Sequence, residues 1–234
     1  MKVMILAAGR GERMRPLTDH TPKPLLSVAG KPIIVHTILQ LVNAGFTDIV
    51  INHAHLGAQI ETALGSGQQF GATISYSPES EQGLETAGGI INALPLLGDE
   101  PFIVVNGDIA TDFDFATLKN VRVDLAHLVL VPNPEHHPDG DFGLDDTGLV
   151  DEQAREALTF SGIGLYSPLL FADLPAGSRK LGGLLRQAIN NQRVSGQQHT
   201  GFWLDIGTPE RLQDLNAYYQ LSVHERHEKH ENKR

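Results

Sequence analysis

Short apolar runs alternate with amphipathic segments through the first half of this 234-residue chain. The expected strands lie at 2–7, 48–52, 72–76 and 101–106, and the expected helices lie at 31–44, 56–64 and 87–97. The run at 101–106 is continuous rather than alternating, which is typical of a central strand in a parallel sheet. This order predicts an α/β fold with a mostly parallel central sheet, helices on both faces and right-handed crossovers.

The second half is less regular. Strand patterns recur at 126–131 and 160–166, on either side of a Pro-, Asp- and Gly-rich loop at 132–148, and helical patterns recur at 181–190 and 209–221. A chain of this length can bury one substantial core, so we expect one domain over 1–223, with halves at about 1–120 and 121–223. The tail 224–234 has no apolar residue, and we expect it to be disordered.

Positive charge is concentrated at the start of an otherwise acidic chain. The formal net charge is −10, and no Lys or Arg occurs from residue 32 to residue 118. Residues 1–31, in contrast, hold Lys2, Arg10, Arg13, Arg15, Lys23 and Lys31 against Glu12 and Asp19. Nucleic-acid binding needs an extended basic face, so we expect no nucleic-acid partner. One local basic loop instead suits a compact polyphosphate.

The cysteine count and the apolar runs bear on the protein's compartment. No cysteine is present, which excludes a disulfide framework, a thiolate metal site and a cysteine nucleophile. The apolar run at 1–8 is too short for a signal peptide, and no run is long enough to cross a bilayer. We therefore expect a cytoplasmic protein without a membrane partner.

A glycine-rich loop follows the first expected strand, in Leu6-Ala-Ala-Gly-Arg-Gly-Glu-Arg-Met-Arg-Pro16. Gly9 and Gly11 lack a Cβ, which lets backbone N–H groups come close to an anion. The arginines of this loop are Arg10, Arg13 and Arg15, and Lys23 follows between two prolines. This concentration of positive charge favours a nucleoside triphosphate over a neutral ligand. The alternative is a solvated basic loop without a ligand.

Three well-known motifs are absent from the chain. Met14 stands where a dinucleotide-binding fingerprint has its third glycine, and the second strand ends in Asn52-His53 without an acidic residue. The Gly-Lys-Ser/Thr of a Walker loop is missing, as is a Gly-x-Ser-x-Gly nucleophile elbow. The prediction of a bound triphosphate therefore does not depend on any of these three motifs.

Two aspartates are candidate ligands for Mg²⁺. Asp108 directly follows the strand 101–106, and open parallel sheets bind ligands at the carboxyl ends of their strands. Asp205 lies between Leu204 and Ile206, where a carboxylate would be costly without a partner, and a metal shared with Asp108 would supply one. The structural alternatives are an Asn-Gly-Asp turn at Asp108 and a helix start after Asp205.

Two further segments carry candidate binding groups. Glu79 and Glu85 lie in a Gly-rich segment that opens the helix at 87–97; they could accept hydrogen bonds from a base or ribose, and the helix N-terminus could attract an anion. Lys180 begins the helix at 181–190 and could face a second phosphate, although a surface lysine is the alternative. The eleven histidines show no zinc-site spacing, and we assign none to a metal.

These motifs, with Asn106-Gly-Asp108 and Trp203-x-Asp205-x-Gly-Thr208 in order, resemble the signature of the sugar-1-phosphate nucleotidyltransferase family across nearly the whole chain. The resemblance implies a Rossmann-like nucleotidyltransferase fold whose two halves bind the nucleotide and the sugar phosphate. It implies catalysis by Arg15, Lys23 and Asp108, with Mg²⁺ on Asp108 and Asp205. The implied nucleotide contacts are Leu6, Ala8, Gly9, Gly11, Glu12, Arg13, Lys23, Glu79, Glu85, Thr86 and Gly88.

Within the family, the segment 83–89 and the short chain resemble the bacterial uridylyltransferases that act on N-acetylmuramate 1-phosphate in peptidoglycan recycling. UTP and a sugar 1-phosphate are then the expected partners. The implied sugar-phosphate contacts are Asn106, Asp141, Gly143, Gly162 and Lys180. The Glu-Lys-Pro segment of many relatives is absent, since Asp151–Arg155 stand there, and Phe160-Ser-Gly162 replaces Asn-Ala-Gly. Guanylyl transfer to mannose 1-phosphate, thymidylyl or uridylyl transfer to glucose 1-phosphate, and a non-catalytic nucleotide-binding role are the alternatives.

Overall fold

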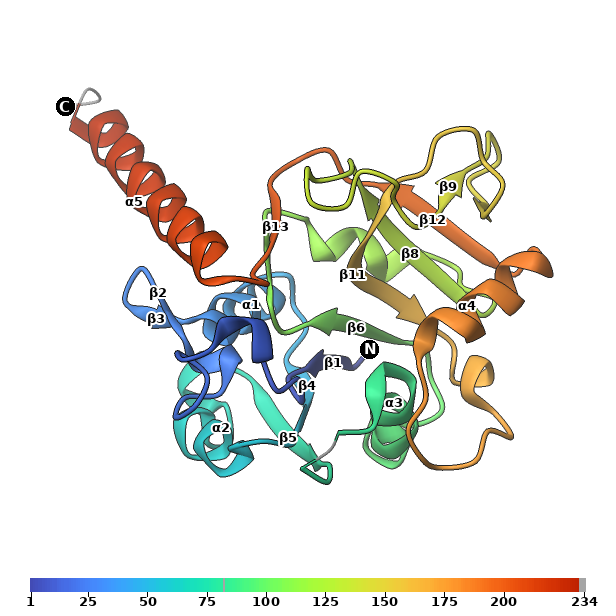
Figure 1. The fold of residues 1–234 in the computed structure, drawn as a ribbon, viewed down its shortest axis with the longest axis horizontal. Coiled ribbons are helices and arrows are strands. Elements are labelled where there is room, and N and C mark those ends of the chain that lie inside the picture. The colour runs from blue at the N-terminus through green and yellow to red at the C-terminus, as the bar shows by residue number, and fades with distance from the viewer. Residues whose placement is uncertain (82, 232–234) are drawn as a thin grey trace.

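The computed structural model describes residues 1–81 and 83–231 and contains a seven-stranded sheet (Figure 1). The strand order is β12-β8-β11-β6-β1-β4-β5. The strands are β1 (Val3–Leu6), β4 (Asp48–His53), β5 (Thr73–Pro78), β6 (Phe102–Asn106), β8 (Ala126–Val131), β11 (Thr159–Tyr166) and β12 (Val194–Gln198). Because β1, β4, β5 and β6 are mutually parallel, their carboxyl ends lie at one edge of the sheet.

The predicted alternation of strands and helices in the first half is confirmed. Helices α1 (Ile33–Asn43), α2 (Gly57–Leu64) and α3 (Glu85–Leu97) connect the parallel strands. Helix α1 begins two residues later than predicted. The reason is that Pro32 has an extended backbone and belongs to the hairpin of β2 (Ser27–Val28) and β3 (Lys31–Pro32).

The second half adds a mixed part to the sheet. Strand β11 runs antiparallel between β6 and β8, and β12 is parallel to β8, so the sheet as a whole is mostly parallel, as predicted. Helix α4 (Leu181–Asn190) has the predicted bounds. The predicted loop 132–148 contains β9 (Gly143–Leu144), which pairs with β10 (Val150–Asp151). Outside the main sheet, β7 (Ile109–Thr111) pairs with β13 (Trp203–Asp205).

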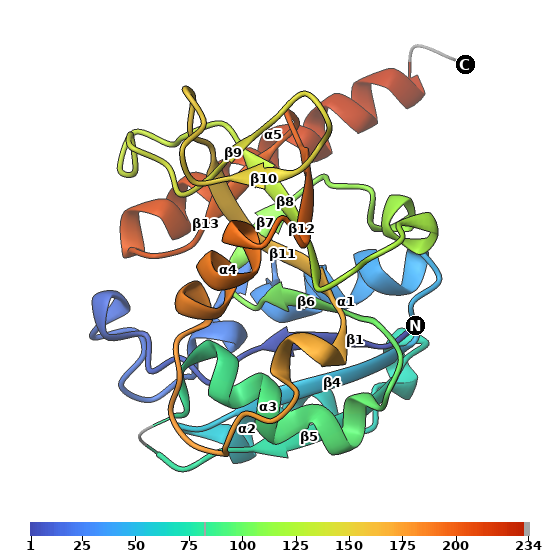
Figure 2. The same cartoon turned by 90° about the vertical axis from the view of Figure 1, so that its right-hand side faces the viewer.

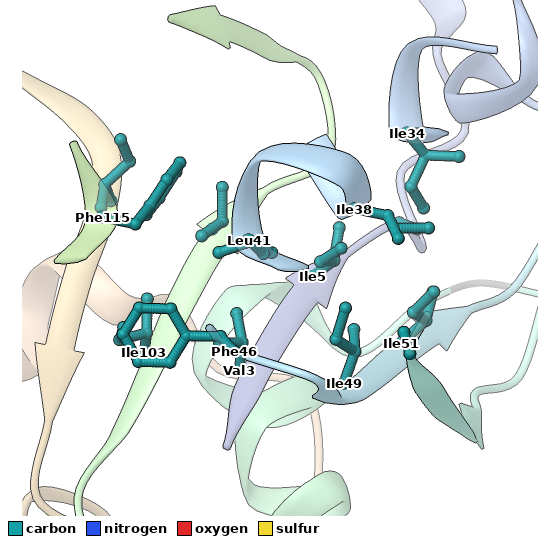
Figure 3. Packing of buried hydrophobic residues seen from close by; sticks show 14 of the residues in the cluster. Val3, Ile5, Ile34, Ile38, Leu41, Phe46, Ile49, Ile51, Ile103 and Phe115 are labelled. Carbon is teal, nitrogen blue, oxygen red and sulfur yellow. The ribbon is translucent and has the colours of Figure 1, made fainter. Parts of the chain in front are cut away.

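Apolar side chains cover both faces of the sheet. Along β1, Val3 and Ile5 face one cluster, which holds Ile34, Ile38 and Leu41 of α1 (Figure 3). Met4 points to the other face, toward the buried residues of α3 and α4. Figure 2 shows α3 and α4 on the same side of the sheet. The prediction of helices on both faces is therefore confirmed.

Helix α5 (Pro209–Glu231) extends away from the rest of the fold (Figure 1). The sequence predicted a helix only at 209–221 and a disordered tail at 224–234. The structure describes helix through Glu231, because no Gly or Pro interrupts the chain between Glu210 and Glu231. Residues 232–234 of the predicted tail lie outside the described residues. None of the helices within the described residues is long and apolar enough to cross a bilayer.

Candidate active site

A cavity of about 590 Å³ opens at the carboxyl edge of β1, β4 and β6. Its walls come from the glycine-rich loop after β1, the ends of β4 and β6, and the segment that leads into α3. Every residue predicted to contact the nucleotide lines this cavity except Gly88. The cavity also lies where open parallel sheets bind their ligands. It is the candidate nucleotide site.

Lys23 and Asp108 meet inside this cavity, although they lie 85 residues apart in the sequence. The Lys23 ammonium donates to the Asp108 carboxylate, and the lysine side chain is 10% exposed. Gly107 permits this approach, because its N–H donates to the carbonyl of Leu6 (2.8 Å) and a Cβ there would lie 2.6 Å from that oxygen. The predicted lysine and aspartate therefore share one location, and each neutralises the other.

Asp205 is brought to the same end of the fold by strand pairing. In the β7–β13 pair, Asp205 is in register with Ile109, and the N–H of Ile206 donates to the carbonyl of Asp108 (2.7 Å). The sequence argument that Asp205 needs a partner was sound, but the partner in the structure is Arg211. Its guanidinium donates to Asp205 Oδ1, and the arginine side chain is only 14% exposed.

A histidine joins this group from the loop that precedes β9. His136 Nε2 lies 3.0 Å from Asp205 Oδ1 and 2.8 Å from Arg211 Nη1. Arg13, which lines the cavity, also approaches Gly207, beside Arg211. Sequence reasoning missed Arg211 and His136, because nothing in the local pattern shows that either would reach Asp205.

The two aspartates fit a divalent cation such as Mg²⁺, which favours one or two protein carboxylates together with phosphate oxygens. Within the described part of the chain, no cluster of three or more His, Cys, Asp or Glu side chains could hold a metal ion. A cation on Asp108 and Asp205 would therefore take its remaining ligands from a bound phosphate and from water.

Arg15 does not lie in the cavity, in contrast to the prediction that it grips the triphosphate. Its side chain is 59% exposed, and its Nε donates to Asp19 Oδ1 (2.6 Å). The short helical turn Glu12–Met14 directs Met14 inward, where it is 1% exposed, and Arg15 follows on the outer side. Arg10 and Arg13 are the arginines of this loop that line the cavity.

Asn52 and Glu79 form a chain of hydrogen bonds, called the relay below, that links the two sides of the cavity. The N–H of Ala7 donates to Asn52 Oδ1 (2.8 Å), and Asn52 Nδ2 donates to Glu79 Oε1 (2.6 Å). Glu79 Oε2 accepts from the N–H of Leu84 (2.8 Å). Both carboxylate oxygens of Glu79, predicted to read a base or ribose, therefore hold the loop before α3. Sequence reasoning missed Asn52, although a polar residue at the end of a buried strand was a usable signal.

Replacing Asn52 by Leu should lower the free energy of unfolding by about 1–3 kcal/mol, because the buried N–H of Ala7 would lose its acceptor. We also expect a higher KM for the nucleotide with a smaller change in kcat, because the loop at 79–84 would lose its link to β1. Urea unfolding and steady-state kinetics test both. Asn43→Leu, at the exposed end of α1, is the control, and an unchanged KM in Asn52→Leu would contradict the relay.

The start of α3 does not present the free N-terminus that the sequence predicted. The N–H groups of Ala87 and Gly88 donate to the carbonyl of Arg179 (2.9 and 3.1 Å), and the N–H of Arg179 donates to the carbonyl of Leu84 (2.9 Å). Gly88 therefore packs against segment 177–179 rather than lining the cavity. Glu85 lines it with a positive φ of 58°, a left-handed conformation that is uncommon for a non-glycine residue.

A second cavity of about 320 Å³ adjoins the first. Leu6, Glu85, Thr86 and Asn106 line both. Four of the five predicted sugar-phosphate contacts, namely Asn106, Asp141, Gly162 and Lys180, line the second cavity. Gly143 does not: it pairs in β9, where a Cβ would lie 2.7 Å from the carbonyl of Glu156. Apart from Gly88 and Gly143, the predicted nucleotide and sugar contacts thus line two connected cavities.

One polar side chain of the second cavity, that of Asp141, is held by neighbouring groups. Asp141 Oδ2 accepts from the N–H of Phe160 (2.8 Å), and Asp141 Oδ1 lies 3.3 Å from His137 Nε2. Burial raises the pKa of Tyr166 above its ordinary range, so its phenol is neutral at physiological pH. The remaining walls are largely aromatic and aliphatic.

Gly162→Ala should weaken sugar-phosphate binding selectively. Gly162 has a φ of +80° at an irregularity in β11, and a Cβ there would lie 2.5 Å from Asn106 Nδ2. We expect the KM for the sugar phosphate to rise about 10-fold or more, through displacement of Asn106, while the nucleotide KM changes little. Gly65→Ala, at φ +54° with open space around it, controls for backbone strain alone. Equal changes in both KM values would contradict the assignment.

Comparisons with known proteins agree with this arrangement. A family model described as nucleotidyl transferase matches residues 2–161. The sequence is 57% identical over 225 residues to N-acetylmuramate alpha-1-phosphate uridylyltransferase of Neisseria meningitidis serogroup B, covering 93% of this chain and 97% of the relative. It is 36% identical over 223 residues to the protein of the same name from Caulobacter vibrioides, covering 88% and 92%.

A solved structure extends the similarity to the fold. The putative glucose-1-phosphate thymidylyltransferase of Bacillus anthracis, crystallised with sucrose, superposes with a TM-score of 0.81 at 26% identity. The superposition covers 93% of this chain and 94% of that one. Sequence and structure therefore match over both cavities and not only over the glycine-rich loop.

Proposed function

This chain belongs to the nucleotidyl transferase family, as a sugar-1-phosphate nucleotidyltransferase, and we propose that it transfers UMP from UTP to N-acetylmuramate 1-phosphate. The products are UDP-N-acetylmuramate and pyrophosphate, and the role is peptidoglycan recycling in the cytoplasm. The observation that carries the choice of substrates is the 57% identity to the Neisseria meningitidis uridylyltransferase over 93% of this chain.

In the proposed reaction, an oxygen of the sugar phosphate attacks the α-phosphorus of UTP in line. A new P–O bond forms, and the bond to the leaving pyrophosphate breaks. The first cavity would hold the triphosphate and the second the sugar, with Asn106 lining both at their junction. Catalysis then comes mainly from positioning and charge neutralisation, and no covalent enzyme intermediate is needed.

The cations of the first cavity would stabilise the charge of the leaving group. Lys23 and Arg13 line it and could bind the β- and γ-phosphates, and Gly9 and Gly11 allow backbone N–H groups to come close. Asp108 and Asp205 would hold Mg²⁺, which when bound neutralises charge on the reacting phosphates. In the structure, Lys23 pairs with Asp108 and Arg211 pairs with Asp205.

Pyrophosphate release tests the proposal directly. Purified protein with Mg²⁺ is given UTP, GTP, dTTP or CTP, each with the 1-phosphates of N-acetylmuramate, N-acetylglucosamine, glucose and mannose. We expect the highest kcat/KM for UTP with N-acetylmuramate 1-phosphate. Preference for GTP with mannose 1-phosphate, or for glucose 1-phosphate, would keep the reaction type and change the substrates. No release with any pair, although nucleotide still binds, would contradict an enzymatic role.

A further inference from the structure

The second cavity holds one cationic side chain among the described residues that line it. This is Lys180, which has no ion pair or hydrogen-bond partner within the part of the chain that the structure describes. Two carboxylates line the same cavity: Asp141 accepts from the N–H of Phe160 and lies 3.3 Å from His137, and Glu85 forms no ion pair with Lys180 in the described residues. An unpaired ammonium in a cavity attracts an anionic group of the ligand.

Lys180 lies on the sugar side of the junction. It lines the second cavity but not the first, whereas the reacting phosphates must lie near Asp108 and Lys23, which line only the first. An anion bound by Lys180 in the second cavity would therefore be a group of the sugar itself rather than one of the phosphates beside Asp108 and Lys23.

The backbone beside Lys180 is fixed from both halves of the fold. The preceding residue, Arg179, bonds through its N–H to Leu84 and through its carbonyl to Ala87. The following residue, Leu181, begins α4 and is 7% exposed. Lys180 is thus held at a set position in the cavity wall, even though its own side chain is exposed.

The other walls of the second cavity favour apolar substituents. Val104, Phe142, Phe160 and Leu185 contribute to them. A hexose with only hydroxyl groups would lose hydrogen bonds to water against such walls, whereas methyl groups gain by contact with them. N-acetylmuramate carries two methyl groups, on its acetyl and lactyl substituents, and the lactyl substituent also carries a carboxylate.

We propose that Lys180 binds the lactyl carboxylate of the sugar and thereby selects N-acetylmuramate 1-phosphate over the neutral sugar N-acetylglucosamine 1-phosphate. This inference rests on the proposed function. These two sugars differ only in the lactyl ether, so a comparison between them isolates the contact with the carboxylate.

The test measures kcat/KM of the wild type and of Lys180→Met with UTP and each of these two sugar phosphates. We expect Lys180→Met to lose about 10- to 100-fold with N-acetylmuramate 1-phosphate, as for a charged hydrogen bond. The loss with N-acetylglucosamine 1-phosphate should be much smaller, so the ratio of the two kcat/KM values falls, and thermal unfolding shows that the variant is folded. Lys180→Arg should retain most of the selectivity, and Lys31→Met, an exposed lysine in β3, is the matched control.

The outcomes separate the two proposals. Equal losses with both sugars would assign Lys180 to the shared phosphate and overturn its contact with the carboxylate. The absence of a loss with either sugar would overturn that contact too. In both cases, a wild-type preference for N-acetylmuramate 1-phosphate would still support the proposed function. A wild type that favours N-acetylglucosamine 1-phosphate would overturn the proposed substrate and this inference together.

Discussion

Asp108→Asn is expected to lower kcat for nucleotidyl transfer by about 1,000-fold or more. Asp108 follows β6 and lines the first cavity, and the N–H of Ile206, the residue after Asp205, donates to the Asp108 carbonyl. A neutral amide cannot balance the charge of a divalent cation, and the reacting phosphates would lose the neutralisation on which such transfers depend. Steady-state pyrophosphate release over a range of Mg²⁺ concentrations measures the effect.

The same substitution removes the partner of a buried ammonium, so loss of activity has to be separated from loss of fold. Lys23 is 10% exposed and pairs with Asp108. The double variant Lys23→Met, Asp108→Asn removes both charges together, and it should regain stability without regaining activity. Asp99→Asn, on the exposed segment after α3, is the control. Activity of Asp108→Asn within 10-fold of the wild type would overturn the assignment of Asp108.

A readout besides turnover tests the metal directly. The paramagnetic ion Mn²⁺ can be titrated into the wild type and Asp108→Asn in the presence of UTP, with bound metal measured by its relaxation effect on water. We expect weaker binding in the variant, because one of the two candidate carboxylates is gone. Equal affinity would place the metal elsewhere.

Most strands of the sheet were predictable from sequence because they are buried apolar runs. Strand β12 (Val194–Gln198) was not predicted, because its sequence is mostly polar and only Val194 is buried. A continuous apolar run such as Phe102–Asn106 indicates a central strand whatever its neighbours in the fold are. The order of strands and helices then restricted the number of possible topologies. The two-residue strands β9 and β10 carry no such signal, since they form only by pairing across the loop predicted at 132–148. In α5, helix continues beyond the end predicted at residue 221, in a stretch that contains no Gly or Pro between Glu210 and Glu231.

The candidate site likewise contains residues whose position could be predicted from the sequence and residues whose position could not. Asp108 and the glycine-rich loop could be predicted, since both directly follow buried strands and so lie at one edge of the sheet. Arg211 and His136 could not, because their contacts with Asp205 depend on how α5 and a distant loop pack. The outward position of Arg15 could not be predicted either, because counting charges in a loop does not show which of them the following turn directs outward.

Gly88→Ala should destabilise the protein by about 1–3 kcal/mol and lower kcat/KM by about 100-fold. A Cβ on Gly88 would lie closer to the carbonyl of Gly177 than the 3.0 Å that real Cβ atoms keep, and it would also meet Leu84 at 3.1 Å. The obstructing atom at Gly177 belongs to the backbone, so no side-chain rotation can relieve the clash. Segment 177–179 must therefore move away from α3.

This movement would reach both cavities, which is why a substitution outside them should affect activity. Ser178 lines the first cavity and Lys180 lines the second, while the carbonyl of Arg179 holds the start of α3. A displacement on the order of 1 Å is enough to misplace reacting groups. Gly183→Ala, in α4 with open space around it, is the matched control and should be neutral or slightly stabilising. Thermal unfolding and kcat/KM for both substrates test the prediction. A destabilised Gly88→Ala enzyme with wild-type kcat/KM would show that segment 177–179 supports the fold without positioning either substrate.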